Sequence, residues 1–316
     1  MPDQQTSPDE PDHADDQWSG PVAHLPPVPP WTRADGVRRF SGISYALVSG
    51  YRPLQLDLWV PPNPTPPPLV VWVHGGAWLS GDRRYLPETL RPEQLFDALV
   101  AAGLAVATVD YRHAREAPFP AQLHDVKAAV RYLRAHADEL GIDVSRVGIW
   151  GESAGGHLAA LVALTAGRPE LEGQVGVVGP ASGVDVVVDW YGVADPDAIP
   201  RLVLPPEMQA LLPPSLVEHP PEILLAGADP AARADAAPVR QVHPDAPPFL
   251  LVHGTADRVV PFGQSEALRD ALAAAGVPVR LVPVAGADHI FNGSDEVDAV
   301  VELSVRYLVT ALTPTA

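Results

Sequence analysis

The sequence contains no cysteine, which excludes disulfide bonds, thiolate nucleophiles and cysteine-ligated zinc. It also lacks any run of eighteen uninterrupted apolar residues, so no transmembrane helix is expected. The polar, acidic start of the chain has neither the basic region nor the apolar core of a signal peptide. A cytoplasmic location is therefore expected.

Basic residues are scarce: 21 Lys and Arg stand against 39 Asp and Glu, which gives a formal net charge of −18. Nucleic acids and anionic membranes attract basic surfaces, so neither is expected as a partner. Residues 1–30 hold six carboxylates and no Lys or Arg. The remaining negative charge is interpreted as a solubilising surface.

The 316 residues, 47% of them hydrophobic, are enough for one large α/β domain. Residues 1–30 are rich in proline and charge and lack periodicity, which predicts a disordered tail. Residues 31–316 are predicted to form the catalytic domain. Within it, the proline-rich stretch 192–247 is predicted to be a cap or lid insertion.

Apolar strands alternate with amphipathic helices along most of the chain. "FSGISYALV" and "PLQLDLWV" read as an antiparallel pair of strands, and "LVVWVHGG" as a strand that is covered on both faces. Helices are expected at about 87–102, 120–141, 155–164, 265–276 and 294–312, and further strands at about 104–111, 146–150, 184–189, 249–254 and 280–286. This alternation predicts an α/β fold with a mostly parallel, doubly wound sheet.

The segment "RVGIWGESAGGHLAAL" places Gly151-Glu152-Ser153-Ala154-Gly155 between an expected strand and an expected helix. A serine on such a sharp turn needs small residues two positions before and after it, so that its hydroxyl can project. Ser153 is therefore the candidate nucleophile. The alternative is a glycine-rich helix start that packs tightly on the sheet.

A serine hydroxyl is a weak nucleophile, so it requires a base, and the base requires an acid that orients it. Asp257 follows the expected strand "FLLVHG", and His289 follows the next expected strand. We expect His289 to be the base and Asp257 the acid. Asp288 is the rival acid, but adjacent residues cannot readily turn their side chains towards each other.

Several other histidines have a structural interpretation. His124 and His136 lie in a charged helix and are read as solvated or packing residues, whereas His253 is expected to hydrogen-bond near the acid loop. No histidine spacing typical of a metal site occurs, so neither a metal nor another cofactor is expected. His74 is expected to brace the loop that follows "VVWV".

Taken in order, the motifs resemble those of the α/β-hydrolase superfamily. Within it, the chain is similar to the branch of hormone-sensitive lipase and the bacterial feruloyl-esterase-like carboxylesterases. The resemblance rests on "HGGAW" at 74–78, "DYR" at 110–112, "FPAQ" at 119–122, "GESAGGHLA", "DWYG" at 189–192, "HGTADRVVP" and Asp288-His289. It implies a serine carboxylester hydrolase that works through Ser153, His289 and Asp257.

The same resemblance implies an oxyanion hole made of backbone N–H groups. Its members are expected among Gly75, Gly76, Ala77 and Ala154. Ala77 stands where the family usually has a third glycine, and Glu152 stands where aspartate is common. The pattern His74-Gly75-Gly76-x-Trp78 also resembles kynurenine formamidases, so an arylformamidase is an alternative. A catalytically silent binding protein on this scaffold is a second alternative.

Four residues are candidates for a substrate pocket: Trp78, Glu152, Trp190 and Tyr191. The alternative for the two tryptophans is packing between sheet and helices. The insertion at 192–247 is not strongly apolar, which favours short-chain or aromatic-acid esters over long-chain triglycerides. The expected partner is thus a small-molecule ester, and the expected assembly is a monomer or homodimer.

Overall fold

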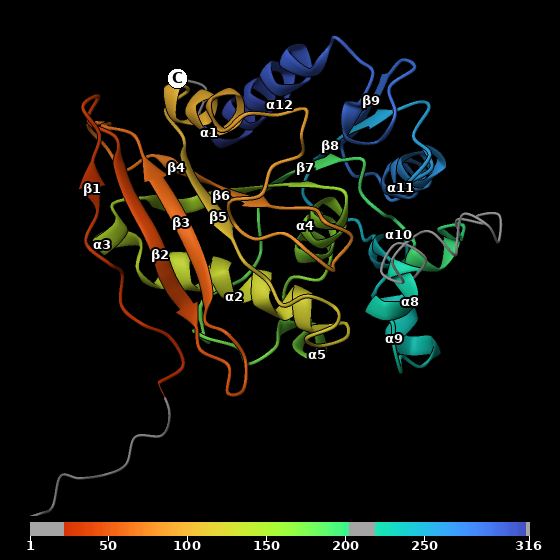
Figure 1. Cartoon of the computed structure of the whole chain (residues 1–316), viewed down its shortest axis with the longest axis horizontal. Helices are drawn as coiled ribbons and strands as arrows, with labels where there is room; N and C mark the ends of the chain where they lie inside the picture. The colour runs from red at the N-terminus through yellow and green to blue at the C-terminus, as the bar shows by residue number, and fades with distance from the viewer. Residues whose placement is uncertain (1–21, 202–218, 314–316) are drawn as a thin grey trace, which may run out of the picture.

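The computed structural model describes residues 22–201 and 219–313. Within these residues the chain forms one nine-stranded sheet in the order β1-β2-β3-β5-β4-β6-β7-β8-β9 (Figure 1). The strands are β1 (Trp31–Thr32), β2 (Arg38–Ala46), β3 (Leu54–Val60), β4 (Pro68–Val73), β5 (Ala105–Val109), β6 (Asp143–Glu152), β7 (Val186–Trp190), β8 (Phe249–Gly254) and β9 (Val279–Val284).

The sheet changes from antiparallel to parallel pairing at β5. Strands β1, β2, β3 and β5 pair antiparallel, and the expected antiparallel pair is β2 with β3. From β5 through β4 and β6 to β9 every neighbouring pair is parallel. The predicted fold class, a mostly parallel sheet with an antiparallel N-terminal pair, is therefore confirmed.

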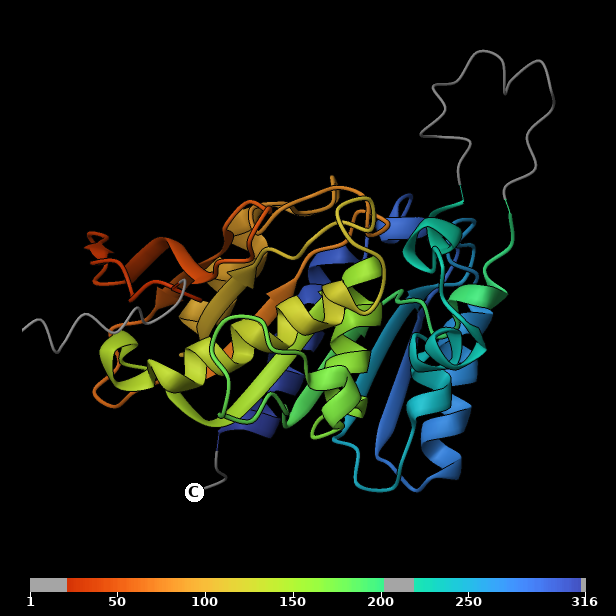
Figure 2. The same cartoon turned by 90° about the horizontal axis from the view of Figure 1, so that it is seen from below.

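Helices cover both faces of the sheet. One face carries α1 (Pro92–Ala101) and α12 (Val297–Leu312), and the other carries α2 (Ala121–Ala135), α4 (Ala154–Leu164) and α11 (Gly263–Ala274). Figure 2 shows α2 and α4 in front of the sheet and α12 behind it. The buried residues of α12 recur every three or four positions, as expected of a helix with one apolar face. The helix expected at 120–141 is instead divided at His136 into α2 and the short α3 (Ala137–Leu140).

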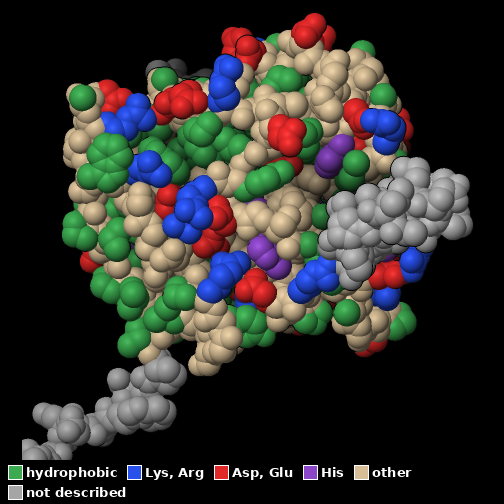
Figure 3. All heavy atoms as spheres, viewed as in Figure 1, with side chains coloured by type: hydrophobic (Ala, Val, Ile, Leu, Met, Phe, Trp, Pro, Cys, Tyr) green, Lys and Arg blue, Asp and Glu red, His purple; other side chains and the backbone are tan. Residues whose placement is uncertain are grey.

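Acidic and basic side chains lie next to one another on the surface shown in Figure 3, rather than in patches of one sign. Ion pairs of this kind include Arg33 with Asp97 at 2.7 Å and Arg52 with Glu116 at 3.3 Å. Negative and positive side chains are therefore interspersed on this face.

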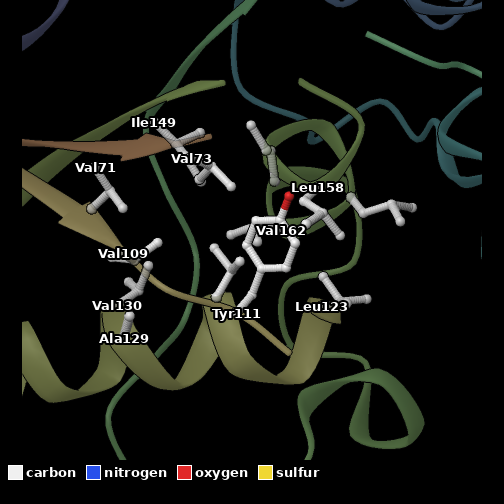
Figure 4. Packing of buried hydrophobic residues seen from close by; sticks show 14 of the residues in the cluster. Val71, Val73, Val109, Tyr111, Leu123, Ala129, Val130, Ile149, Leu158 and Val162 are labelled. Carbon is white, nitrogen blue, oxygen red and sulfur yellow. The ribbon is translucent and has the colours of Figure 1, made fainter. Parts of the chain in front are cut away.

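The core between the sheet and helices α2 and α4 consists mainly of aliphatic side chains. Every residue of β5 and of β7 is buried, as expected of strands covered on both faces. In Figure 4 valines of β4 and β5 face Leu158 and Val162 of α4, and the ring of Tyr111 lies among them. Tyr111 lies two residues after the end of β5, so the core extends to the end of the sheet where the strands' carboxyl termini lie.

The opposite core contains a row of tryptophans from three neighbouring strands. Trp72, Trp150 and Trp190 come from β4, β6 and β7, and all three are completely buried. The ring centroids of Trp150 and Trp190 are 4.7 Å apart in an edge-to-face arrangement. Trp190 also donates a hydrogen bond from its indole nitrogen to the Ser304 hydroxyl of α12 at 3.0 Å.

The segment before β1 differs in part from the expected tail. Residues 1–21 lie outside the described residues, while residues 22–30 have no regular secondary structure but contact the body of the protein. Leu25 donates its N–H to Ser44, and its carbonyl accepts the Tyr132 hydroxyl at 2.8 Å. The expectation of disorder up to residue 30 is therefore wrong for this segment, because its backbone finds hydrogen-bond partners on β2 and α2.

The stretch predicted as an insertion contains short helices where it is described. These are η1 (Pro196–Ala198), α8 (Pro220–Leu224), α9 (Pro230–Asp235) and α10 (Pro238–Gln241), and residues 202–218 lie outside the described part. Helix α10 packs against both α4 and α11. Among the described helices, none has the length and apolar character needed to cross a bilayer.

Candidate active site

Ser153 lies on a sharp turn between β6 and α4. Its φ of 54° and ψ of −118° form a combination that non-glycine residues rarely adopt. The flanking glycines are required by space: a Cβ on Gly151 would lie 2.1 Å from the carbonyl oxygen of Gly155, and one on Gly155 would lie 2.1 Å from that of Val73. The turn thus has the strained geometry that presents a serine hydroxyl above a sheet.

The three residues predicted as nucleophile, base and acid are adjacent in space. Ser153 Oγ lies 3.1 Å from His289 Nε2, and His289 Nδ1 lies 2.7 Å from Asp257 Oδ2. They follow β6, β9 and β8 respectively, so the carboxyl ends of the parallel strands bring them together. Ser153 itself is 8% exposed.

Asp257 is held as a carboxylate by several donors. Its Oδ1 accepts the N–H groups of Val259 and Val260, each at 2.8 Å. Burial acts to raise the pKa of Asp257, but hydrogen bonds from His253 and His289 outweigh burial and hold this pKa well below its usual range. A carboxylate that stays ionised in this position can orient the imidazole and stabilise its protonated form.

His253 and Asp288 take up positions beside this group. His253 is buried next to Asp257, and its Nδ1 lies 2.7 Å from the Ser265 hydroxyl, in agreement with the expected role near the acid loop. Asp288 instead forms an ion pair with the exposed Arg258, whose hydrogen bond lowers the pKa of Asp288 to about 2. The rival acid is thus directed away from the imidazole.

The loop after β4 has three consecutive residues with positive φ: Gly76 at 101°, Ala77 at 56° and Trp78 at 59°. Within the described part of the chain, the N–H groups of Gly76, Ala77 and Ala154 donate to no protein acceptor. Unpaired N–H groups beside a nucleophile are the chemical requirement of an oxyanion hole.

Gly75 was also expected in the oxyanion hole, and the structure corrects this. Its N–H donates to Glu152 Oε1 at 2.6 Å and is therefore not available to a ligand. A Cβ at position 75 would lie 2.1 Å from the same oxygen. Gly75 is needed because the Glu152 carboxylate approaches the backbone so closely.

The rings of Tyr111 and His74 also stabilise the loop after β4. The Tyr111 hydroxyl donates to the carbonyls of His74 and Gly75 at 3.0 and 3.1 Å. The His74 ring is stacked on Tyr111 with centroids 4.3 Å apart, and burial lowers the pKa of His74 to about 4. His74 is thus a neutral brace, as expected. The sequence contained Tyr111 in "DYR" but gave no sign of its contact with residues 74 and 75.

Two buried carboxyl groups near Ser153 have raised pKa values. Burial raises the pKa of Glu152 to about 7, against the opposing effects of the nearby His289 and of the Gly75 hydrogen bond. Burial also raises the pKa of Asp189 to about 7, against the hydrogen bond from the Gly192 N–H. Within the described residues, no group of three or more His, Asp or Glu side chains is arranged so that it could hold a metal ion.

A comparison with protein families matches residues 56–272 to the model described as BD-FAE. The chain belongs to the BD-FAE family. Among curated relatives, esterase LipC of Mycobacterium tuberculosis is 32% identical over 243 residues, which are 75% of this chain and 57% of LipC. This BD-FAE chain spans about half the length of the curated relatives it matches.

Solved structures of esterases have the same fold as the BD-FAE chain. A truncated carbohydrate esterase from gut microbiota has a TM-score of 0.70 at 28% identity and covers 88% of this chain and 99% of its own. The esterase Est2 of Thermogutta terrifontis, solved with propionate bound, has a TM-score of 0.65 at 27% identity, with 87% and 96% covered. The BD-FAE chain therefore has the α/β-hydrolase fold.

The residues expected to line a substrate pocket in this BD-FAE chain are buried instead. Trp190 belongs to the tryptophan row, and Trp78 is only 3% exposed. Glu152 binds Gly75, and Tyr191 packs edge-on against the His289 ring with centroids 5.0 Å apart. Each of the four side chains thus has a packing or hydrogen-bonding contact in the structure, and their part in a substrate pocket stays a prediction.

Proposed function

We propose that the protein is a carboxylesterase that hydrolyses small carboxylic esters through an acyl-enzyme on Ser153. The observation that carries this proposal is the line of contacts from Ser153 Oγ through His289 to Asp257, at 3.1 and 2.7 Å, on a strained strand-to-helix turn. Its family and the named esterases that resemble it support the same reaction class.

The proposed reaction has two steps of acyl transfer. His289 Nε2 takes the proton of Ser153 Oγ as the oxygen attacks the ester carbonyl, and Asp257 stabilises the resulting imidazolium. The free N–H groups of Gly76, Ala77 and Ala154 then bind the negative oxygen of the tetrahedral intermediate. The imidazolium gives its proton to the leaving alcohol. A water molecule, deprotonated by the same imidazole, releases the acid.

The Glu152 carboxyl has a supporting part in this scheme. It fixes the Gly75 N–H at 2.6 Å, and the next two peptide units carry the amides of Gly76 and Ala77. Tyr111 fixes the carbonyls of the same turn. Preorganised donors cost no rearrangement when charge develops, and one such donor typically contributes about 10²–10³ in rate.

We propose esters of short-chain or aromatic acids as substrates. Est2, one of the similar structures, was solved with propionate bound, and another is a carbohydrate esterase. Activity that rises beyond about ten acyl carbons and increases sharply at an oil–water interface would contradict this preference. The relatives reported above are named as esterases, so no observation favours the formamidase alternative.

The decisive experiment compares wild type with Ser153→Ala on p-nitrophenyl acetate and butyrate. We expect the variant to lose at least about 10³-fold in kcat, because the nucleophile is gone, while its far-UV circular dichroism stays unchanged. N-formylkynurenine serves as the comparison substrate for a formamidase. Labelling by a fluorophosphonate probe should also disappear in the variant. Wild-type turnover by Ser153→Ala would reject the proposal, and an inactive, unlabelled wild type would favour a binding protein.

A further inference from the structure

His157 lies on α4, four residues after Ser153, and contacts two loops of the site. Its Nδ1 is 3.2 Å from the indole Nε1 of Trp78, in the loop after β4. Its Nε2 is 2.7 Å from the carbonyl oxygen of Ala236, in the insertion after β7. The imidazole of His157 thus connects two segments. One is the loop of residues 74–78 after β4, called the oxyanion loop from here on, and the other is the insertion after β7.

The partners of His157 permit only one protonation state. An indole N–H can only donate, so Nδ1 must accept, and a carbonyl can only accept, so Nε2 must carry the proton. His157 and Ala236 are completely buried, and Trp78 is 3% exposed. Burial lowers the pKa of His157 to about 4, which keeps the ring neutral. Both hydrogen bonds are therefore satisfied in a dry environment, where losing a partner is costly.

Trp78 has a backbone that needs such support. Its φ is 59° and that of Ala77 is 56°, so two consecutive non-glycine residues are left-handed. The Trp78 carbonyl accepts the Ala114 N–H at 2.7 Å, which fixes the end of the turn. His157 fixes the side chain of the same residue, next to the N–H of Ala77.

The segment around Ala236 is fixed to the rest of the site. Ala236 follows α9, and Val239 of α10 donates to the Ala194 carbonyl at 3.1 Å. The Gln264 side chain of α11 accepts the N–H groups of Ala194 and Asp195, each at 2.8 Å. Hydrogen bonds made by α10 and α11 therefore hold the part of the insertion that contacts His157.

We propose that His157 is a positioning residue. It fixes the position of the oxyanion loop relative to the insertion through the contacts Trp78–His157–Ala236. The inference rests on the proposed esterase function. His157 touches neither the substrate nor the reacting atoms. It acts through Trp78 on the position of the Ala77 N–H. Because that N–H binds negative charge only in the transition state, His157 affects the stabilisation of the transition state rather than substrate binding.

The test replaces His157 with Leu in the full-length chain and counts active sites by titration with an organophosphate that releases p-nitrophenolate. Per titrated site, we expect kcat for p-nitrophenyl butyrate to fall about tenfold, while KM changes by less than about twofold. Affinity for a trifluoromethyl ketone, which forms a tetrahedral adduct with the serine, should fall in parallel with kcat. A merely structural role would lower the number of active sites or the melting temperature and leave these quantities per site unchanged.

Two further variants keep the test informative if His157→Leu folds poorly. His157→Gln retains an acceptor and a donor, so it should recover most of the lost kcat. Trp78→Phe removes the indole N–H but keeps a buried ring, and it should reproduce the loss. Because both changes break the same contact, the double variant Trp78→Phe/His157→Leu should lose no more than the larger single loss.

Ser304→Ala is the matched control, because it removes the acceptor of another buried indole hydrogen bond, that of Trp190 at 3.0 Å. It should lower the melting temperature without changing kcat per site. Wild-type kcat per site in both His157→Leu and Trp78→Phe would overturn the inference. Failure of the proposed function is a different result, in which the wild type itself lacks esterase activity that depends on Ser153.

Discussion

At the scale of single residues, Glu152 links the Ser153 turn to the loop after β4 at an energetic cost. It is 1% exposed and accepts a hydrogen bond from the Gly75 N–H, and the Tyr191 hydroxyl also favours its charged form. A buried carboxylate with so few donors binds a proton more tightly than one in water, which is why the pKa of Glu152 rises from 4.5 to about 7. Strain and buried charge of this kind concentrate at functional sites.

The raised pKa of Glu152 predicts how stability changes with pH. Between about pH 4.5 and 7 the unfolded chain releases this proton while the folded chain keeps it, so the free energy of unfolding decreases as pH rises through this range. The shift corresponds to a change on the order of 3 kcal/mol. Glu152→Gln cannot titrate, and its stability should therefore depend less on pH between 5 and 7. Urea unfolding at pH 5, 6, 7 and 8 measures the difference.

Asp189 provides the control for this experiment. Its pKa is raised to about 7 by the same cause, so Asp189→Asn should also flatten the profile, and the double variant should flatten it further. If the free energy of unfolding changes with pH equally in wild type and Glu152→Gln between pH 5 and 7, Glu152 is ionised in the folded protein throughout this range.

At the scale of elements, an ion pair attaches the loop after β5 to helix α2. Arg112 donates three hydrogen bonds to Asp125, from its backbone N–H, Nε and Nη2, at 2.8, 2.8 and 2.7 Å. Both residues are buried. Arg112 directly follows Tyr111, the residue that holds the carbonyls of His74 and Gly75. The pair therefore helps to place α2 relative to the oxyanion loop.

Asp125→Ala should lower the free energy of unfolding by about 3–5 kcal/mol, because it leaves a buried guanidinium without its partner. The double variant Arg112→Met/Asp125→Leu removes both charges and should be more stable than the single variant. Urea unfolding at pH 7 gives both values. If Asp125→Ala stays within about 1 kcal/mol of wild type, the pair does not hold the loop.

The sequence was sufficient to predict the strands and the proximity of Ser153, Asp257 and His289, because both follow from local patterns. Runs such as "LVVWVHGG" identify the strands, and Ser153, Asp257 and His289 each follow a strand whose carboxyl end lies at the same edge of the sheet. The directions of the supporting side chains could not be predicted in this way. Glu152 turns towards Gly75, which is 77 residues earlier, and Trp190 turns towards α12. Such contacts depend on tertiary packing, which no local pattern contains.

The directions of the aromatic side chains near Ser153 could not be predicted for the same reason. An aromatic residue beside a reactive group looks identical in sequence whether it faces solvent or the next layer. Trp78 faces His157, and Tyr191 faces His289 and Phe291. Ala77, Trp78 and Tyr191 have positive φ, and non-glycine residues give no sequence signal for that conformation.

At the scale of the whole molecule, the net charge of −18 should affect which esters reach the site. A negative protein repels anionic substrates and attracts cationic ones, and salt weakens both effects. Raising the ionic strength from about 10 to 100 mM shortens the screening length from about 30 to 10 Å. We therefore expect kcat/KM for p-nitrophenyl hemisuccinate, an anionic ester, to rise severalfold over this range.

Two esters complete this experiment, because each isolates one contribution. Uncharged p-nitrophenyl butyrate should show almost no salt dependence, which controls for effects of salt on the enzyme itself. A thiocholine ester, which is cationic, should show the opposite trend, since screening removes its attraction to the protein. The mixed charges visible in Figure 3 predict that steering arises from the summed charge rather than from one local patch. The same salt response for all three esters would show that the net charge does not extend its influence to Ser153.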